Sequence, residues 1–148
     1  MTHKPMEQRP ALLVSACLLG VRCNHRGEAS RSQSVLNLAS AFRLVPICPE
    51  TAGGLPTPRP AAELCDDGSV HTAAGQDVTI SYRQGAAAAL SLARAVGARR
   101  AVLKARSPSC GCHQVYDGTF SRTLVDREGV TAAELRRAGL EVISEDDL

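Results

Sequence analysis

Three short, largely apolar runs, each followed by a cysteine, constrain the fold of this 148-residue chain more than any other feature. The runs cover residues 11–16, 43–47 and 100–105, and the cysteines that follow them are Cys17, Cys48 and Cys110. Runs of this kind, without polar alternation, are typical of strands buried on both faces of a parallel sheet. Parallel strands end at one edge of the sheet, where open α/β sheets bind ligands, so we expect the three sulfurs to gather there.

Segments of helical character separate the strands. Helices are predicted over residues 34–42, 78–96 and 130–138, and a fourth strand over residues 140–143. The long helix is rich in alanine, Asp77 or Thr79 can cap it, and Gly97 ends it. Thr131 and Glu134 form a capping-box pattern in the last helix. This alternation predicts an α/β fold: three layers, Rossmann-like, with a mainly parallel sheet and helices on both faces.

The remaining segments are expected to be irregular. We expect residues 1–10 to form a flexible tail, residues 11–148 a single α/β domain, and residues 144–148 an acidic tail. Five prolines between positions 46 and 60 argue against a helix and predict a long, stiff loop over residues 50–62. A short β segment is predicted just after it, over residues 69–72.

The composition argues against several classes of partner. A net charge of +2, no tryptophan, two phenylalanines and two tyrosines disfavour a platform for nucleic-acid polymers. No stretch approaches the roughly 20 apolar residues of a membrane span, and the first ten residues lack the apolar segment of a signal peptide. We therefore expect a cytoplasmic protein, a monomer or weak homodimer, whose partner is a small molecule. Disulfides are rare in that compartment, so six cysteines indicate metal binding, catalysis or burial.

Two of the strand ends place reactive groups together. Cys17 lies at a strand-to-loop junction, where backbone N–H groups favour a thiolate, although a small buried residue is the alternative. Cys48-Pro49-Glu50 sets a thiol and a carboxyl group two residues apart, and Glu50 is expected to act as general acid–base. A solvated side chain or a helix cap is the alternative for Glu50. Cys23, six residues after Cys17, is a candidate for a further ligand or for a resolving thiol.

The third strand end carries small and polar residues around Cys110. Gly111 is expected to let the backbone approach a bound ligand closely, and Ser107 and Ser109 add hydroxyl donors. Tyr116 begins a predicted turn beside this loop and is expected to contact substrate. The alternative is a simple β-turn with packed aromatic rings.

Three thiolates are one fewer than a closed metal site requires. An iron–sulfur cluster with three protein ligands leaves one iron open, whereas zinc would need a fourth ligand such as His25 or Cys65. The Cys-x-Cys spacing favours Cys110 as the ligand and keeps Cys112 in reserve. Of the other histidines, His3 and His71 are expected to be solvated and His113 is left open. Besides a cluster enzyme, the alternatives are a cysteine-persulfide sulfurtransferase and a non-catalytic zinc-binding module.

Taken together, these segments resemble one family over about residues 11–145. The shared motifs are residues 15–20 (SACLLG), 48–50 (CPE), 53–60 (GGLPTPRP), 77–79 (DVT), 107–111 (SPSCG) and 116–120 (YDGTF). The chain is similar to the bacterial domain-of-unknown-function family that includes the iron–sulfur-dependent thiouracil desulfurases. It departs from many relatives after Cys23, where they carry Arg-Tyr-Asp-Gly and this chain carries residues 24–27 (NHRG).

The resemblance implies a function and a set of site residues. It implies a 4Fe–4S cluster held by Cys17, Cys48 and Cys110, with one iron free of protein that takes the sulfur of a thiolated uracil. It implies Glu50 as the acid–base residue and a nearby serine as its helper, for which we favour Ser107. The expected activity is that of a desulfidase that removes sulfur from a thiolated nucleobase, nucleoside or related thiocarbonyl compound and releases hydrosulfide.

Overall fold

A computed structural model describes residues 4–148, so His3 and the first part of the expected N-terminal tail lie outside it. Its centre is a sheet of four strands in the order β2-β1-β5-β8, and all neighbouring pairs are parallel. The strands are β1 (Ala11–Ser15), β2 (Arg43–Ile47), β5 (Arg100–Leu103) and β8 (Glu141–Ser144). The predicted parallel α/β sheet is confirmed.

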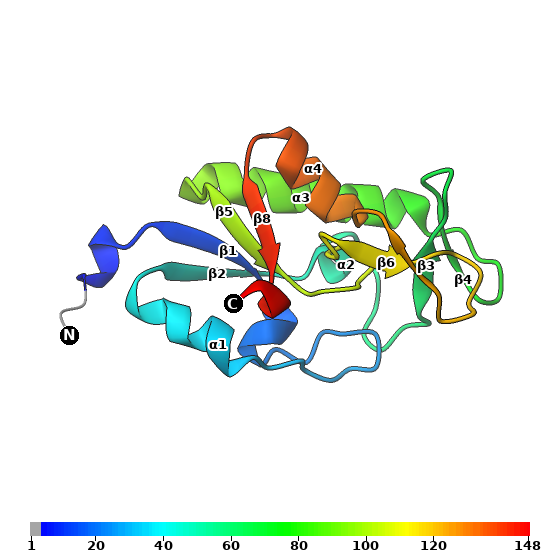
Figure 1. The fold of residues 1–148 in the computed structure, drawn as a ribbon, viewed down its shortest axis with the longest axis horizontal. Coiled ribbons are helices and arrows are strands. Elements are labelled where there is room, and N and C mark those ends of the chain that lie inside the picture. The colour runs from blue at the N-terminus through cyan, green and yellow to red at the C-terminus, as the bar shows by residue number, and fades with distance from the viewer. Residues whose placement is uncertain (1–3) are drawn as a thin grey trace.

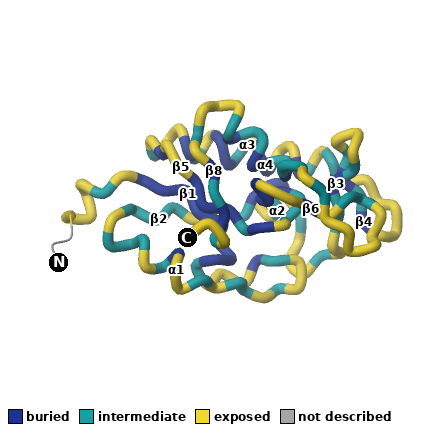
Figure 2. The backbone as a smooth tube through the Cα atoms, viewed as in Figure 1, coloured by how far each residue is buried: buried dark blue, intermediate teal, exposed yellow. Residues whose placement is uncertain are grey.

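Burial along the strands follows their place in the sheet. Every residue of the inner strand β1 is buried, as its unbroken apolar sequence predicts. The edge strand β2 is only partly buried, and Pro46 is tolerated there because an edge strand has unpaired positions. Figure 2 shows this difference as a dark β1 beside a paler β2.

Two helices cover one face of the sheet. They are α3 (Thr79–Val96) and α4 (Val130–Arg137), which lie above the strands in Figure 1. Leu13 and Leu103 of the sheet pack with Ala89 and Ala93 of α3 and Leu135 of α4 in one apolar cluster. Burial of this cluster stabilises the folded state by roughly 25 cal/mol for each Å² of apolar surface removed from water.

Shorter helical segments cover the other face. They are the 3₁₀ helices η2 (Ala16–Leu19) and η3 (Asn37–Ser40) and the one-turn helix α1 (Gln33–Leu36). Val14 and Val102 of the sheet pack here against Leu18 and Val35, so the predicted helices on both faces are confirmed. The single helix expected over residues 34–42 is wrong in detail. Its second half tightens to 3₁₀ geometry where the Ser40 hydroxyl bonds back to the Asn37 carbonyl.

Two β-hairpins extend beyond the carboxyl ends of the central strands, at the right of Figure 1. The first pairs β3 (Ala62–Leu64) with β4 (Val70–Thr72), and the second pairs β6 (Gln114–Tyr116) with β7 (Leu124–Asp126). The short β segment predicted near residues 69–72 is thus confirmed. Among the described residues, no helix is long and apolar enough to cross a membrane.

Two expectations of irregular structure are wrong. The proline-dense segment begins with the one-turn helix α2 (Pro49–Ala52), because proline is well suited to the first helical position. The acidic C-terminal segment forms the 3₁₀ helix η4 (Glu145–Asp147), and the side chains of Ser144 and Asp147 close a capping box.

The described part of the N-terminal segment contains the 3₁₀ helix η1 (Met6–Gln8). It is followed by Arg9, whose guanidinium donates to the Ala39 carbonyl at 2.7 Å.

The expected capping box of α4 is also wrong. Gly129 is the N-cap residue, and Thr131 lies inside the helix with its hydroxyl bonded to Ser109 at 2.8 Å. At α3 the N-cap is Val78, while the Asp77 carboxylate accepts the Thr79 N–H at 2.9 Å. The helices thus begin near the predicted positions but are held there by other groups.

Candidate metal centre and adjoining cavity

A cavity of about 650 Å³ opens at the carboxyl ends of β1, β2 and β5. The thiols of Cys17, Cys48 and Cys110 all border it, as the position of each after a strand predicts. Its size lies within the range of small-molecule sites. The gathering of the three cysteines at one edge is therefore confirmed, while their role as ligands stays a prediction.

Each cysteine is placed by a short structure that follows its strand. Cys17 lies in η2 directly after β1, and Cys48 is the N-cap residue of α2 directly after β2. Cys110 lies in the loop after β5, where its N–H donates to the Ser107 hydroxyl at 3.0 Å. The parallel ladder fixes where the strands end, and thereby where the segments that carry these thiols begin.

The cavity disfavours free thiolates at its floor. Burial raises the pKa of Cys17 to about 11, against the opposing effect of the Lys104 ammonium group. Burial also raises the pKa of Cys110 to about 12, although a hydrogen bond from Ser15 opposes it. A bound cation reverses this balance, because metal coordination deprotonates a thiol outright. The site therefore suits a metal group better than it suits free thiolates.

A fourth thiol borders the same cavity. Burial and the neighbouring Cys48 raise the pKa of Cys23 to about 12, and the Cys48 thiol donates to the Cys23 carbonyl at 3.6 Å. The structure thus brings Cys23 close to the expected ligands. Both predicted roles, a further ligand and a resolving thiol, are compatible with this position.

The spacing and chemistry of the donors fit a cluster better than a single zinc ion. Zinc–sulfur bonds of about 2.3 Å bring the ligands of one tetrahedral ion to within about 4 Å of one another. Within residues 4–148, the one group of three His, Cys, Asp or Glu side chains with ligand atoms within 4.8 Å lies elsewhere. Of the described side chains at the cavity, no three therefore bring their ligand atoms to the spacing of one zinc ion, whereas a cluster does not require this because its separate irons each take one thiolate. His25 borders the cavity, whereas Cys65 does not and instead lies 3.7 Å from His71 Nδ1.

Glu50 faces this cavity from α2 and is held by two side chains. Arg59 Nε donates to Glu50 Oε2 at 2.7 Å, and the Tyr82 hydroxyl donates to Glu50 Oε1 at 3.0 Å. The Arg59 side chain is only 4% exposed, and its Nη2 also donates to the Cys23 carbonyl at 2.8 Å. Burial and the Glu50 charge raise the pKa of Tyr82 well above its usual range, so its hydroxyl stays a donor.

Sequence reasoning missed Arg59 and Tyr82 as site residues. Arg59 occurs only within a proline-rich motif, and Tyr82 looks like an ordinary core residue of α3. An arginine is almost never fully buried unless it is paired, and only the fold reveals that its partner is nine residues earlier. For Tyr82, the one signal in the sequence was that it is the single tyrosine of an alanine-rich helix.

Close helix packing sets the position of Glu50. A Cβ atom on Gly85 of α3 would collide with the carbonyl of Pro49, and one on Gly53 would collide with the carbonyl of Ser81. The two glycines therefore let α2 lie directly against α3. A glycine inside a helix costs about 1 kcal/mol relative to alanine, and this contact explains why Gly85 is there.

The Ser107 hydroxyl lies at the cavity and has a proton to offer. Its oxygen accepts the N–H groups of Ser109 at 3.1 Å and Cys110 at 3.0 Å. Because both bonds use the oxygen as acceptor, the hydroxyl proton remains available for a ligand. Ser107 thus shapes the loop that presents Cys110 and can also donate into the cavity.

Two residues expected to bind substrate do not border the cavity. Ser109 is 1% exposed, and its hydroxyl is paired with Thr131 of α4. A Cβ atom on Gly111 would lie 2.8 Å from the Ser107 carbonyl, so this glycine lets the loop close on itself. Both residues stabilise the Cys110 loop, and their expected contact with substrate has no support in this placement.

The outer wall of the cavity comes from the two hairpins, and basic side chains from several other segments also border the cavity. Tyr116 is the last residue of β6 and not the start of a turn, and it borders the cavity together with Glu63 of β3; its contact with substrate stays a prediction. The cationic side chains at its border are Arg26, Arg59, Lys104, Arg106 and Arg122. Arg106 and Arg122 have positive φ angles of 66° and 60°, a strained conformation that clusters at functional sites.

A parallel α/β sheet that presents several cysteine thiols to a small-molecule cavity, with a clamped carboxyl group beside them, is the arrangement expected of an enzyme that holds a metal or cluster through sulfur. Residues 12–147 match the family described as 2-thiouracil desulfurase. The chain belongs to this family.

Two relatives span nearly the whole chain. An uncharacterized protein of Bacillus subtilis (strain 168), YbbK, is 40% identical over 146 residues, which is 93% of this chain and 97% of that protein. The solved structure of TudS, a [4Fe-4S]-dependent thiouracil desulfidase, is 44% identical with a TM-score of 0.88. That comparison covers 95% of this chain and 93% of TudS.

Proposed function

We propose that this protein is a [4Fe–4S]-dependent desulfidase that converts a thiolated uracil or a related thiocarbonyl compound to its carbonyl form. The family membership and the likeness to TudS support this function. The observation that carries it is the meeting of Cys17, Cys48 and Cys110 with Glu50 at one cavity of about 650 Å³. The substrate would be a free nucleobase or a nucleoside.

The three cysteines would hold the cluster and leave one iron without a protein ligand. When bound, the cluster supplies a soft Lewis acid for the thiocarbonyl sulfur and for the hydrosulfide that leaves. The net reaction consumes one water and releases one hydrogen sulfide, so it needs no oxidant or reductant. In this respect the activity is of a hydrolase or lyase type.

Glu50 would move the protons of that reaction. Two nitrogens of Arg59 contact Glu50 Oε2, whereas Oε1 has a further lone pair beside the bond from Tyr82, so Oε1 can accept a proton from an attacking water. It would then return the proton to the leaving sulfur. The two donors hold the carboxyl group in one orientation, which lowers the entropic cost of positioning the water.

Ser107 and the hairpin wall would orient the substrate. The free Ser107 proton can bond to the substrate or to the water as charge develops on them. Tyr116 at the rim offers an aromatic ring that can lie against a nucleobase. The cavity floor would thus perform the chemistry while its rim binds the base.

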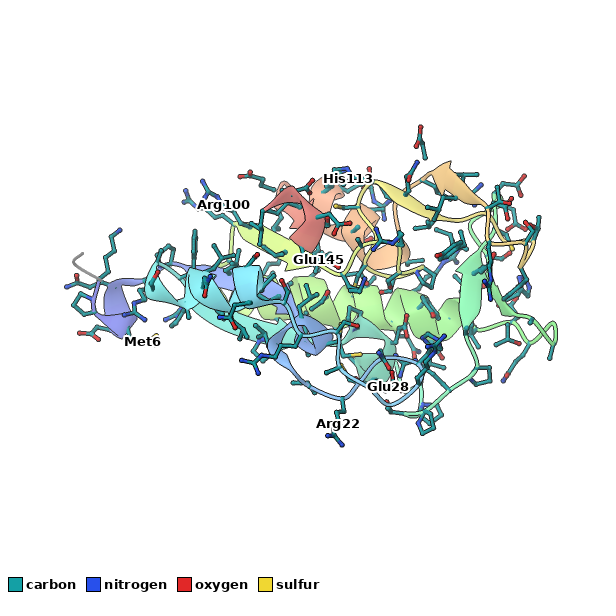
Figure 3. The ribbon with its side chains drawn as sticks, turned by 60° about the horizontal axis from the view of Figure 1, so that its bottom comes forward. Met6, Arg22, Glu28, Arg100, His113 and Glu145 are labelled. Atoms are coloured by element: carbon teal, nitrogen blue, oxygen red, sulfur yellow. The ribbon has the colours of Figure 1, made fainter. Side chains whose placement is uncertain are left out.

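The test compares Glu50→Gln with Glu28→Gln, which changes an exposed carboxyl group on the loop after η2 (Figure 3). Both proteins are purified without oxygen, and iron, acid-labile sulfide and turnover of a thiouracil are measured. We expect about four irons and four sulfides in both, with turnover lost only in Glu50→Gln. Full activity in cluster-loaded Glu50→Gln would refute the acid–base role. A chain that takes up no iron would refute the desulfidase function.

A further inference from the structure

A second group of metal-ligand atoms lies outside the cavity, at the C-terminal end of the chain. The ligand atoms of Cys112, His113 and Asp147 all lie within 4.8 Å of one another. His113 Nε2 and Asp147 Oδ2 are 2.8 Å apart, while Cys112 is 2% exposed. Figure 3 shows His113 beside the C-terminal helix η4, which carries Asp147. The Cys110 loop and the end of the chain therefore meet at this group.

We propose that Cys112, His113 and Asp147 form a second metal site, which takes a divalent ion of the zinc type. One thiolate, one imidazole and one carboxylate are ligands that Zn²⁺ accepts, and three protein ligands with a water complete a tetrahedron. The thiolate and the carboxylate together balance the charge of the ion. This site is distinct from the cavity that Cys17, Cys48 and Cys110 border, and it goes beyond the proposed desulfidase function.

Neighbouring groups already orient two of these ligands. Asp147 Oδ2 accepts the Ser144 N–H at 2.8 Å within the capping box. Arg136 Nη1 donates to the Cys112 carbonyl at 3.2 Å. Outer-shell bonds of this kind fix ligand orientation in metal sites.

The charges around Cys112 also favour a cation. The charged groups that act on its thiol are Asp147, Arg136 and Glu128, so two carboxylates face one guanidinium. Among the described side chains, Glu128 Oε2 is the one buried polar atom without a hydrogen-bond partner. Because Arg136 is already paired with Glu128 at 3.2 Å, the Asp147 carboxylate is the negative charge that a divalent ion here would balance.

Metal binding here would stiffen the floor of the cavity. The helix η4 also carries Glu145, which accepts the Ala105 N–H at 2.8 Å and pairs with Lys104 Nζ at 3.0 Å. Lys104 in turn borders the cavity. An ion bound between Cys112 and Asp147 would therefore tie the cysteine loop and this helix together, and the protein would gain stability from its binding.

The test uses cluster-loaded protein and Zn²⁺ alone. After equilibration and removal of loosely bound ion, iron and zinc are counted for the wild type, His113→Ala and His71→Ala. His71 is the matched control, because it is another partly exposed histidine paired with an aspartate, at 3.6 Å. We expect one zinc in the wild type and in His71→Ala, with iron unchanged. Because loss of an outer-shell partner already costs 10–100-fold, His113→Ala should lose about 100-fold or more in zinc affinity.

A second probe identifies the thiolate. With Co²⁺ in place of zinc, a thiolate-to-metal charge-transfer band should appear in the difference spectrum and vanish in Cys112→Ser. The thermal midpoint should rise with zinc in the wild type and stay constant in His113→Ala. Retention of no zinc, equal retention by His113→Ala, or loss of iron on zinc addition would overturn the site. None of these outcomes depends on desulfidase turnover.

Discussion

The two walls of the cavity are built in different ways. The inner wall consists of residues in the segments that follow the parallel strands, and Cys17 and Cys110 there are 9% and 5% exposed. The outer wall comes from the β3–β4 and β6–β7 hairpins, and Tyr116 there is 36% exposed. The inner wall is thus fixed by the sheet and its core, whereas the outer wall rests on hairpins of three residues per strand.

This difference separates chemistry from recognition. Residues on regular elements are held more precisely than residues on loops, and reactive groups need that precision. Exposed hairpins and loops tolerate sequence change, and binding preferences commonly vary there. We therefore expect changes in the inner wall to abolish the cluster or turnover, and changes in the outer wall to alter substrate binding only.

The largest effect is expected from the inner-wall cysteines. Serine at position 17, 48 or 110 (Cys17→Ser, Cys48→Ser, Cys110→Ser) should abolish cluster binding, because a hydroxyl does not replace a soft thiolate. Iron and sulfide content and the visible spectrum of protein purified without oxygen provide the measurement. Cys65→Ser is the matched control, since Cys65 lies on a hairpin next to His71 and not at the cavity.

The same experiment decides the place of Cys23. If Cys23→Ser keeps about four irons per chain, three cysteines suffice and one iron lacks a protein ligand. If Cys23→Ser loses the cluster, Cys23 is a fourth ligand and the open iron required by the proposed mechanism is absent. Full iron content in Cys48→Ser would contradict the assignment of the inner wall altogether.

The inner wall could be predicted from the sequence and much of the remainder could not. An apolar run marks both β1, which is fully buried, and the edge strand β2, which is only partly buried, so the ends of these strands, and with them Cys17 and Cys48, could be predicted. Ser109 was misplaced because residue type reveals a hydroxyl but not its direction. Its partner Thr131 is 22 residues away in the chain and meets it only in the fold.

Long-range pairing explains the other misses. Arg59 and Tyr82 reach Glu50 across 9 and 32 positions, and no local pattern encodes such a contact. The acidic C-terminal segment resembled a solvated tail, because its charged side chains are as compatible with water as with a folded segment. It is held in place because Glu145 pairs with Lys104 and accepts the N–H of Ala105, 40 positions earlier in the chain.

A smaller effect than cluster loss is expected from the clamp on Glu50. Arg59→Lys keeps the charge but loses the planar, multidentate guanidinium that holds Glu50 Oε2 and the Cys23 carbonyl. Because misplacement by about 1 Å can cost about 100-fold, kcat should fall by about that factor with iron content unchanged. Arg83→Lys on the exposed side of α3 is the control. Unchanged kcat in Arg59→Lys would show that Glu50 does not need this clamp.

The smallest effect is expected at the outer wall. Tyr116→Ala removes an aromatic ring at the rim, and since an aromatic contact contributes about 0.5–1.5 kcal/mol, KM should rise by about 2–13-fold. The kcat value and the iron content should stay constant, because the inner wall is untouched. Leu124→Ala, which changes the exposed partner of Tyr116 across the hairpin, controls for loosening of the hairpin itself. If Tyr116→Ala lowers kcat with KM unchanged, or if Leu124→Ala raises KM equally, the two walls do not divide chemistry from recognition at this residue.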